Sequence, residues 1–220
     1  MSTLSASSPV LWCLGAFLCG SIPFGLILVK LSGKGDVREH GSGNIGATNV
    51  SRVGGKALGV LTLLLDILKG FLPVFLAKKM GFSFEVLSLL SLAAVLGHVF
   101  TPWLKFQGGK GVATALGVIL ATDASMMMLP MGTFLFALFL TRHVSLGSIL
   151  AAAMVPVQLL LGAWAVSWGA PMSRSVGPIL PWLALVVLVI WKHRENITRL
   201  QAGTEAKLWG ATKETHDAQG

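Results

Sequence analysis

Three polar segments of the sequence combine glycine with hydroxyl or amide side chains, and each contains or adjoins a cation. In each, glycines allow backbone N–H groups to converge on one point, and the cation completes a site for an anion. This pattern favours phosphate binding. The segments are GSGNIGATN at 41–49 followed by Arg52, KFQGGKG at 105–111 followed by Thr114, and HRENITRL at 193–200 followed by Gly203 and Glu205.

The first segment also matches two nucleotide-binding patterns, both incompletely. Residues 41–46 fit G-x-G-x-x-G, and Asp66 follows about 20 residues on, where that fingerprint has an acid. The fingerprint needs a preceding strand and a βαβ unit, whereas this segment joins two apolar runs. The phosphate-loop pattern requires a lysine where Ala47 stands. We therefore expect no nucleotide cofactor.

The second and third segments suit helix ends. Glycines 108–111 precede an apolar run, and a helix beginning near Val112 would direct its free N–H groups at an anion beneath Lys110. A flexible turn with a solvated lysine is the alternative. In the third segment, His193 and Asn196 are three residues apart. They would share one face of a helix if the apolar run before them, at 176–191, is helical and the helix continues through this segment.

Ionisable residues also occur within apolar runs. Asp66 and Lys69 would share one face of a helix and are expected to pair with each other inside a helix bundle. Ionised side chains within a membrane are also candidates for function. His98 is expected to be a satisfied polar group within a helix. The remaining histidines outside the three segments have no comparable setting: His40, His143 and His216.

Composition indicates that membrane helices must position these segments. Apolar residues make up 54% of the 220 residues and charged residues 12%, about half the charged share of a soluble domain. A membrane helix needs about 20 apolar residues. We predict an all-α membrane bundle forming a single domain over residues 1–220, with a short polar tail from about 204. Its seven expected helices are 11–29, 57–77, 86–104, 112–122, 124–141, 144–173 and 176–191, or five if 57–77 and 112–122 do not span.

The loop charges predict the orientation. Seven crossings place thirteen lysines and arginines on one side and three on the other, which puts the N-terminus outside and the C-terminus in the cytoplasm. Residues 1–29 carry no charge, which argues against a cleaved signal. The net charge of +8 is thus explained by topology, and no nucleic-acid partner is expected.

In this order, the three segments resemble the bacterial acylphosphate-dependent glycerol-3-phosphate acyltransferase family. The strings SGNIGATNV at 42–50 and GGKGVAT at 108–114 and the pattern H-R-x-N-I-x-R-L at 193–200 carry the resemblance, which extends from the first span to Glu205. It implies an integral membrane enzyme that acylates position 1 of glycerol 3-phosphate from a fatty acyl phosphate, giving lysophosphatidic acid. Gln107 departs from the family, which often has lysine there.

The resemblance also implies the site and its surroundings. The partners would be glycerol 3-phosphate, fatty acyl phosphate and membrane lipids, without metal or cofactor, at a bacterial inner membrane with the site facing the cytoplasm. The implied catalytic residues are Ser42, Lys110, His193 and Asn196. The implied substrate- and phosphate-binding residues are Gly43, Asn44, Gly46, Ala47, Thr48, Asn49, Arg52, Gly108, Gly109, Gly111, Thr114, Arg199 and Glu205.

The implied chemistry is consistent with the residues. An acyl phosphate is already activated, so the protein must mainly position the glycerol hydroxyl and neutralise charge as the oxyanion forms. No histidine is followed by aspartate at the fifth position, so the H-x-x-x-x-D pair of thioester-dependent acyltransferases is missing. We expect direct attack, with a covalent route through Ser42 and a His193 base as the alternative.

Two other classes remain as hypotheses. A transporter of organic phosphates would also use basic glycine-rich loops, but it is expected to show an internal repeat and a site near the midplane. We find no repeat. A phosphatidyl transferase would need clustered aspartates for magnesium. The aspartates of this chain are scattered, at Asp36, Asp66, Asp123 and Asp217.

Overall fold

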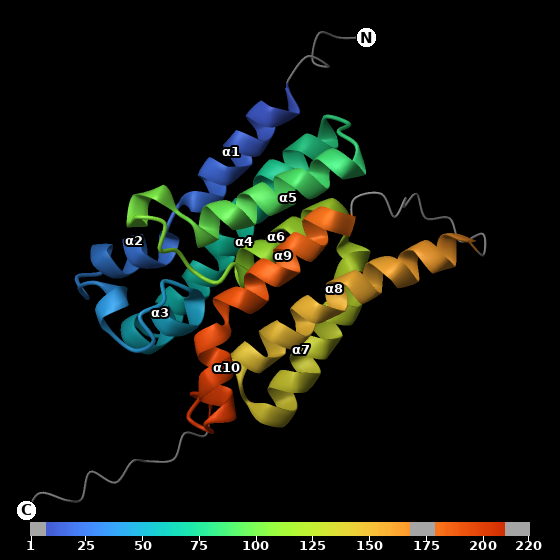
Figure 1. Cartoon of the computed structure of the whole chain (residues 1–220). Coiled ribbons are helices and arrows are strands. Elements are labelled where there is room, and N and C mark those ends of the chain that lie inside the picture. The colour runs from blue at the N-terminus through green and yellow to red at the C-terminus, as the bar shows by residue number, and fades with distance from the viewer. Residues whose placement is uncertain (1–7, 168–178, 210–220) are drawn as a thin grey trace, which may run out of the picture.

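The computed structural model describes residues 8–167 and 179–209, and within these ranges every regular element is a helix (Figure 1). The predicted all-α fold is therefore confirmed. The elements are α1 (Pro9–Ser21), α2 (Phe24–Leu31), η2 (Val37–Glu39), α3 (Ala47–Gly54), α4 (Lys56–Lys79), α5 (Phe84–Val99), η3 (Pro102–Leu104), α6 (Val112–Asp123), η4 (Ala124–Met127), α7 (Met128–Thr141), α8 (Val144–Ser167), α9 (Ile179–Lys192) and α10 (Arg194–Gln201).

Several helical stretches are long and apolar enough to cross a membrane. The described residues contain five: Pro9–Leu31, Lys56–Lys79, Phe84–Leu104, Val112–Thr141 and Val144–Gly162. The helix α9 is apolar but shorter. The count of seven crossings and the orientation of the termini stay predictions. Parts of the last two expected spans, 168–173 and 176–178, lie outside the described residues.

The first expected span is broken. α1 ends at Ser21 and α2 begins at Phe24, with Ile22 in an extended conformation between them. Pro23 causes the break, because proline has no N–H and disfavours helical geometry in the residue before it. Within the expected span 86–104, α5 likewise ends at Val99, shortly before Pro102. The chain then continues as the 3₁₀-helix η3.

The chain also breaks after α6. The break was expected between 122 and 124, but α6 continues to Asp123, η4 follows, and α7 begins at Met128. The helix α3 was not expected, because it lies within the polar stretch 30–56. It is amphipathic and buries Asn49, Val50 and Gly54, and it packs against α4.

Glycines allow the central helices to pack closely. The most extensive contacts join α4 to α6 and α1 to α5. Small residues let membrane helices approach until their backbones touch. A Cβ atom would lie within 2.4 Å of a carbonyl oxygen of the facing helix at each of four glycines: Gly20, Gly70, Gly97 and Gly117.

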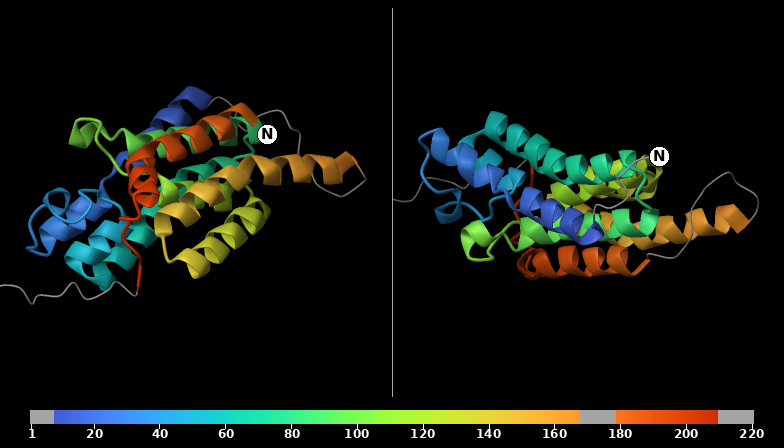
Figure 2. Two further views of the ribbon diagram at one scale, coloured as in Figure 1. Left: turned by 60° about the horizontal axis from the view of Figure 1, so that its bottom comes forward. Right: turned by 90° about the horizontal axis from the view of Figure 1, so that it is seen from above.

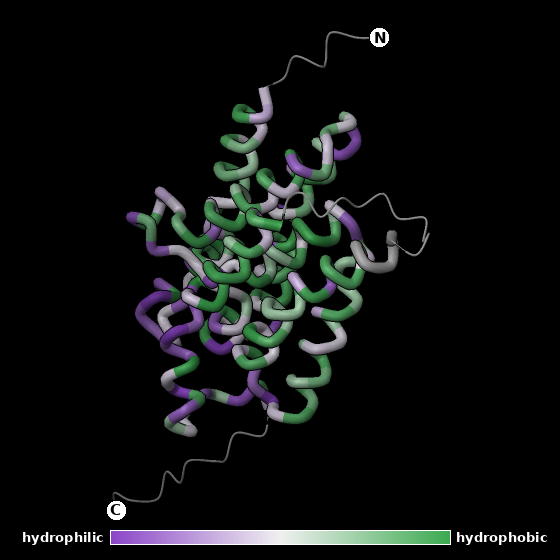
Figure 3. The backbone as a smooth tube through the Cα atoms, turned by 45° about the vertical axis from the view of Figure 1, so that its right-hand side comes forward, coloured by the Kyte–Doolittle hydropathy of each residue, from purple (hydrophilic) through white to green (hydrophobic). Residues whose placement is uncertain are grey.

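The outside of the bundle is largely apolar, as a membrane protein requires. Phe139 of α7 is 77% exposed and Val187 of α9 is 66% exposed. Hydrophilic residues gather at the end of the molecule where the C-terminal tail leaves, with a smaller group at the opposite end (Figure 3). The far half of α8 extends away from the other helices (Figure 2). The polar end contains all three segments that the sequence singled out.

Candidate active site

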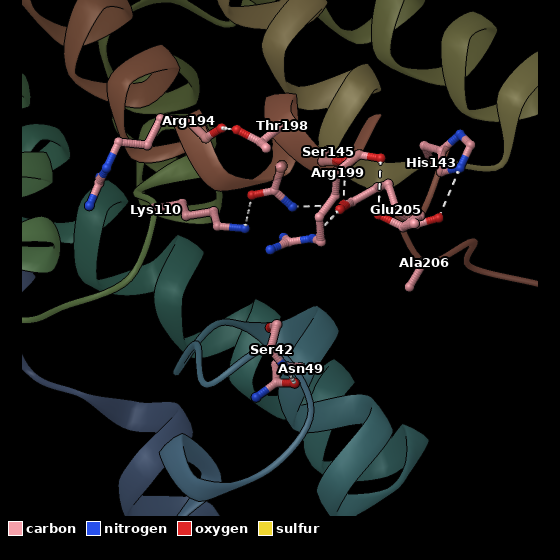
Figure 4. A network of polar contacts seen from close by, with 12 residues as sticks. Ser42, Asn49, Lys110, His143, Ser145, Arg194, Thr198, Arg199, Glu205 and Ala206 are labelled. Atoms are coloured by element: carbon pink, nitrogen blue, oxygen red, sulfur yellow. Dashed lines mark hydrogen bonds and ion pairs between the residues drawn. The ribbon is translucent and has the colours of Figure 1, made fainter. Parts of the chain in front are cut away.

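A chain of polar contacts crosses the polar end of the bundle (Figure 4). The Lys110 Nζ donates to Asn196 Oδ1 at 2.5 Å, and Asn196 Nδ2 donates to Glu205 Oε1 at 2.6 Å. Arg199 Nε donates to Glu205 Oε2 at 2.7 Å, and Ser145 Oγ donates to Glu205 Oε1 at 2.6 Å. The second and third segments therefore meet, and the Glu205 carboxylate ties together α8, α10 and the tail.

The charges of this network favour an anion. Burial lowers the pKa of Lys110 to about 8, and the nearby charge of Arg199 adds to this effect, while Glu205 opposes it. Burial would raise the pKa of Glu205, but hydrogen bonds from Ser145, Asn196 and Arg199 hold it below its usual value. At neutral pH, the cations of Lys110 and Arg199 therefore outnumber the single carboxylate of Glu205, which already accepts several hydrogen bonds. The surplus positive charge can be neutralised by a phosphate.

His193 lies at the junction between α9 and α10 and is 2% exposed. Its Nδ1 is 2.7 Å from the carbonyl oxygen of Val189. A carbonyl only accepts, so Nδ1 carries the proton and Nε2 has a free lone pair. Burial lowers the pKa of His193 to about 4, and the charge of Lys110 contributes. His193 is therefore neutral at pH 7, and Nε2 is its unprotonated ring nitrogen.

Asn49 organises the first segment from within. It is 2% exposed, its Oδ1 accepts from the Ser42 N–H at 2.9 Å, and its Nδ2 donates to three loop carbonyls. Gly41 lies over the Asn49 side chain with φ +62°, where a Cβ would come within 2.3 Å of Oδ1. Asn44 Oδ1 similarly accepts from the Gly46 N–H at 2.8 Å. These amides shape the loop that presents Ser42.

The first segment faces the network. Ser42 and Asn49 lie on the opposite side from Lys110 and Arg199 (Figure 4). Ser42 is exposed, and its hydroxyl has no hydrogen-bond partner among the described residues. Arg52 of α3 reaches across, with Nη2 3.5 Å from the carbonyl oxygen of Ala206. All three segments therefore border one region, as the sequence indicated.

The glycines of the second segment do not present their N–H groups as expected. The Gly108 N–H donates to the carbonyl of Val99 at 3.0 Å, and the Gly109 N–H donates to that of His98 at 3.2 Å. Both bonds satisfy carbonyls at the C-terminal end of α5, which lack partners within the helix. Gly111 caps α6 with φ +84°. The Lys110 side chain, and not a cradle of Gly108 and Gly109 N–H groups, is what this turn contributes to the network.

The remaining sequence-selected residues differ in how far they are buried. Gly43 is exposed, whereas Ala47 and Thr48 in the first turn of α3 are half-buried. Thr114 is completely buried in α6, and its hydroxyl has no partner among the described residues. Gln107 lies apart from the Lys110 network. It borders a separate pocket of about 570 Å³, lined by Pro23, Leu26, Lys30, Arg38, Trp103, Leu104, Lys105 and Gln107.

The start of α8 was missed by sequence reasoning. Ser145 donates to Glu205, His143 Nε2 is 3.2 Å from the Glu205 carbonyl oxygen, and the Leu208 N–H donates to the carbonyl of Arg142 at 2.8 Å. The polar tail expected from about 204 is thus docked as far as Leu208. The available signal was a cluster of hydroxyl residues around Arg142, namely Thr141, Ser145 and Ser148.

A metal centre would need clustered ligands. Within the parts of the chain that the structure describes, no three His, Cys, Asp or Glu side chains gather closely enough to hold a metal ion. The polar atoms of the site instead come from amides, hydroxyls, cations and one carboxylate.

A family model described as glycerol-3-phosphate acyltransferase matches residues 10–203. This chain belongs to the glycerol-3-phosphate acyltransferase family. A family member from Geobacter sulfurreducens is 48% identical over 195 residues, covering 88% of this chain and 94% of that protein. One from Agrobacterium fabrum is 45% identical over 205 residues, covering 92% and 94%. The resemblance drawn from the three segments is confirmed.

Solved structures of the glycerol-3-phosphate acyltransferase family show the same fold. The glycerol 3-phosphate form of PlsY (YgiH), an integral membrane glycerol 3-phosphate acyltransferase, matches with a TM-score of 0.82 and 39% identity, covering 93% of this chain and 96% of that chain. The lysophosphatidic acid form matches with a TM-score of 0.79, covering 91% and 95%. With its several apolar helices, this chain is an integral membrane protein.

Proposed function

We propose that this chain transfers a fatty acyl group from acyl phosphate to the sn-1 hydroxyl of glycerol 3-phosphate, giving lysophosphatidic acid and inorganic phosphate. The observation that carries this proposal is the arrangement of Lys110 and Arg199 opposite Ser42, with Arg52 reaching across. Both substrates carry a phosphate, and the acyl chain of the donor requires an apolar environment. A cationic region at the end of an apolar bundle meets both requirements.

Relatives support the acceptor and the product. Family members are named glycerol-3-phosphate acyltransferases, and the solved PlsY structures are described as glycerol 3-phosphate and lysophosphatidic acid forms. We assign acyl phosphate as the donor because the sequence lacks the histidine–aspartate pair of thioester-dependent enzymes.

The proposed step is direct attack. The glycerol oxygen forms a bond to the acyl carbon, the bond from that carbon to the phosphate oxygen breaks, and the hydroxyl proton leaves through His193 Nε2 to the departing phosphate. Lys110 and Arg199 neutralise phosphate charge, and Asn196 orients Lys110. The His193 pKa of about 4 keeps the imidazole unprotonated at neutral pH and makes it a weak base, so His193 relays the proton to the more basic departing phosphate and does not retain it. Ser42 holds substrate by hydrogen bonds.

The exposed Ser42 hydroxyl supports direct attack over an acyl-enzyme. A serine nucleophile needs a base within about 2.6–3.2 Å, and no described residue hydrogen-bonds to this hydroxyl. The enzyme incubated with labelled acyl phosphate alone, then digested, should show no label on the peptide containing Ser42. Stoichiometric labelling that disappears on adding glycerol 3-phosphate would establish the covalent route instead.

We place the protein in the bacterial inner membrane with the site facing the cytoplasm. The support is the predicted excess of basic residues on one side, which is also the side of all three polar segments.

The donor is tested with the purified full-length chain. Acyl phosphate, acyl coenzyme A and acyl carrier protein are each offered with glycerol 3-phosphate, and lysophosphatidic acid and phosphate are measured. We expect product only from acyl phosphate, with one phosphate released per product. Product from a thioester donor would contradict the assignment. Uptake of glycerol 3-phosphate into proteoliposomes without any acyl transfer would favour the transporter.

A further inference from the structure

Three ionisable side chains are buried in the bundle outside the network described above. Asp66, Lys69 and His98 each have side chains no more than 3% exposed. Lys69 Nζ lies 2.7 Å from Asp66 Oδ1, and His98 Nδ1 lies 3.9 Å from the same oxygen. Buried charges within a membrane are costly unless they are paired. His98, which was expected to be satisfied, has no hydrogen-bond partner for Nδ1 among the described residues.

This cluster lies directly behind the turn that carries Lys110. The Gly109 N–H donates to the backbone carbonyl of His98, and the Gly109 Cα packs on the imidazole so closely that a Cβ would lie 2.1 Å from Nε2. Gly109 immediately precedes Lys110 in the chain. The position of the His98 ring therefore limits where the Lys110 backbone can lie.

The cluster also holds the break between α1 and α2. Lys69 Nζ donates to the carbonyl of Ile22 at 2.7 Å, replacing a helical partner that the break removes. Thr101, just after α5, donates to the neighbouring carbonyl of Ser21 at 2.6 Å. The broken helix, α4 and the α5–α6 connection are thus joined through hydrogen-bonded groups in a low-dielectric interior, where such contacts strongly resist separation.

We propose that Asp66, Lys69 and His98 form a positioning unit that sets Lys110 against Asn196. The inference rests on the proposed function, because it takes Lys110 as the phosphate-binding cation. None of the three touches the network itself, so they act through the turn at 108–111. The competing interpretation is that the ion pair contributes only to stability.

The two interpretations differ in whether the loss of activity caused by a cluster variant depends on Lys110. The double variant Asp66→Asn, Lys69→Met removes both charges together, because removing one would leave the other buried and unpaired. Misplacement of a catalytic group by 1 Å can cost about a hundredfold in rate. We expect kcat/KM for glycerol 3-phosphate to fall about tenfold in the wild-type background and less than twofold in a Lys110→Arg background. Equal losses in both backgrounds would overturn the proposal.

Two further variants keep the test decisive if the double variant does not fold. His98→Asn removes the imidazole behind Gly109 and should show the same dependence on Lys110. Lys69→Arg keeps a charge and donors for both partners, and it should retain activity to within about twofold. Loss of activity in Lys69→Arg without coupling in His98→Asn would reject the positioning role.

A matched control comes from another part of the bundle. Trp182 Nε1 donates to Ser88 Oγ at 3.0 Å in the buried core. Ser88→Ala should lower the temperature of thermal unfolding without showing any coupling to Lys110. Coupling as strong as that of the cluster variants would mean that general destabilisation explains the effect.

An activity-independent measurement separates this proposal from the proposed function. Acetylation of the Lys110 amine in the full chain, followed by mass spectrometry, should be severalfold faster in the cluster variants, with exposed Lys56 as the internal reference. If the wild-type chain does not use acyl phosphate, the proposed function fails, and this labelling still decides the positioning role. An unchanged acetylation rate would overturn the role even in an active enzyme.

Discussion

Lys110 combines a charge with a fixed position, since it bonds to Asn196 and its amine is held in a partly buried setting. We expect Lys110→Met to reduce kcat/KM by roughly tenfold to a hundredfold, because a lost charge-assisted contact costs about 1.5–3 kcal/mol. Thermal unfolding should change little. Gln107→Ala is the control, because Gln107 lies in the separate pocket. Full activity in Lys110→Met would reject the phosphate-binding role.

The alkaline pH dependence should report the same residue. The pKa of Lys110 is lowered to about 8, so the amine is charged below pH 8 and loses its charge as the pH rises through that value. An uncharged amine binds phosphate weakly, so kcat/KM should fall above about pH 8 in the wild type. Lys110→Arg should move this decline to higher pH, since arginine stays charged. A decline unchanged in Lys110→Arg would belong to another group.

At the scale of elements, the tail after α10 completes the site. Glu205 accepts hydrogen bonds from α8 and α10 through both carboxylate oxygens. Glu205→Gln removes the charge that holds Arg199 and supplies an N–H₂ group where a donor already points. We expect about a tenfold loss in kcat/KM and a lower temperature of thermal unfolding.

Glu195→Gln, on the preceding helix α10, is the matched control. Its side chain is 70% exposed, and its ion pair with Arg194 is long, at 3.8 Å. Exposed pairs of this kind contribute about 0–1 kcal/mol. Equal losses in the two variants would show that charge on α10, rather than anchoring of the tail, is what matters.

Whether an element could be predicted depended on whether the residues that determine it are close together in the sequence. Apolar runs are local signals, and the three polar segments were recognised from their own residues. The break at Ile22-Pro23 also has a local cause, but the expected span 11–29 overlooked it. Ser145 was missed because its role, unlike the cluster of hydroxyl residues around Arg142, depends on Glu205, which is distant in sequence and folds against it. The orientation of the Gly108 and Gly109 N–H groups was also missed, because it depends on unpaired carbonyls of α5.

At the scale of the whole molecule, thiol labelling tests the predicted orientation. Cysteines placed at Asn44, Gln107 and Gln201 should be protected from an impermeant thiol reagent in intact cells and react after permeabilisation, because the basic residues predict that this side is cytoplasmic. Lys79→Cys, at the opposite end of α4, should react in intact cells. Ready reaction of any of the first three from outside would reverse the orientation.

The docking of Glu205 also has a consequence for synthesis. A ribosome makes the Ser42 loop and Lys110 early, but the carboxylate that joins α8 to α10 follows the last described helix. A nascent chain can therefore hold most of its helices in the bilayer and still lack the anchor of its cationic site. Catalytic competence then arrives only once Glu205 has been translated, so chains truncated before Glu205 are expected to be inactive even when they insert correctly.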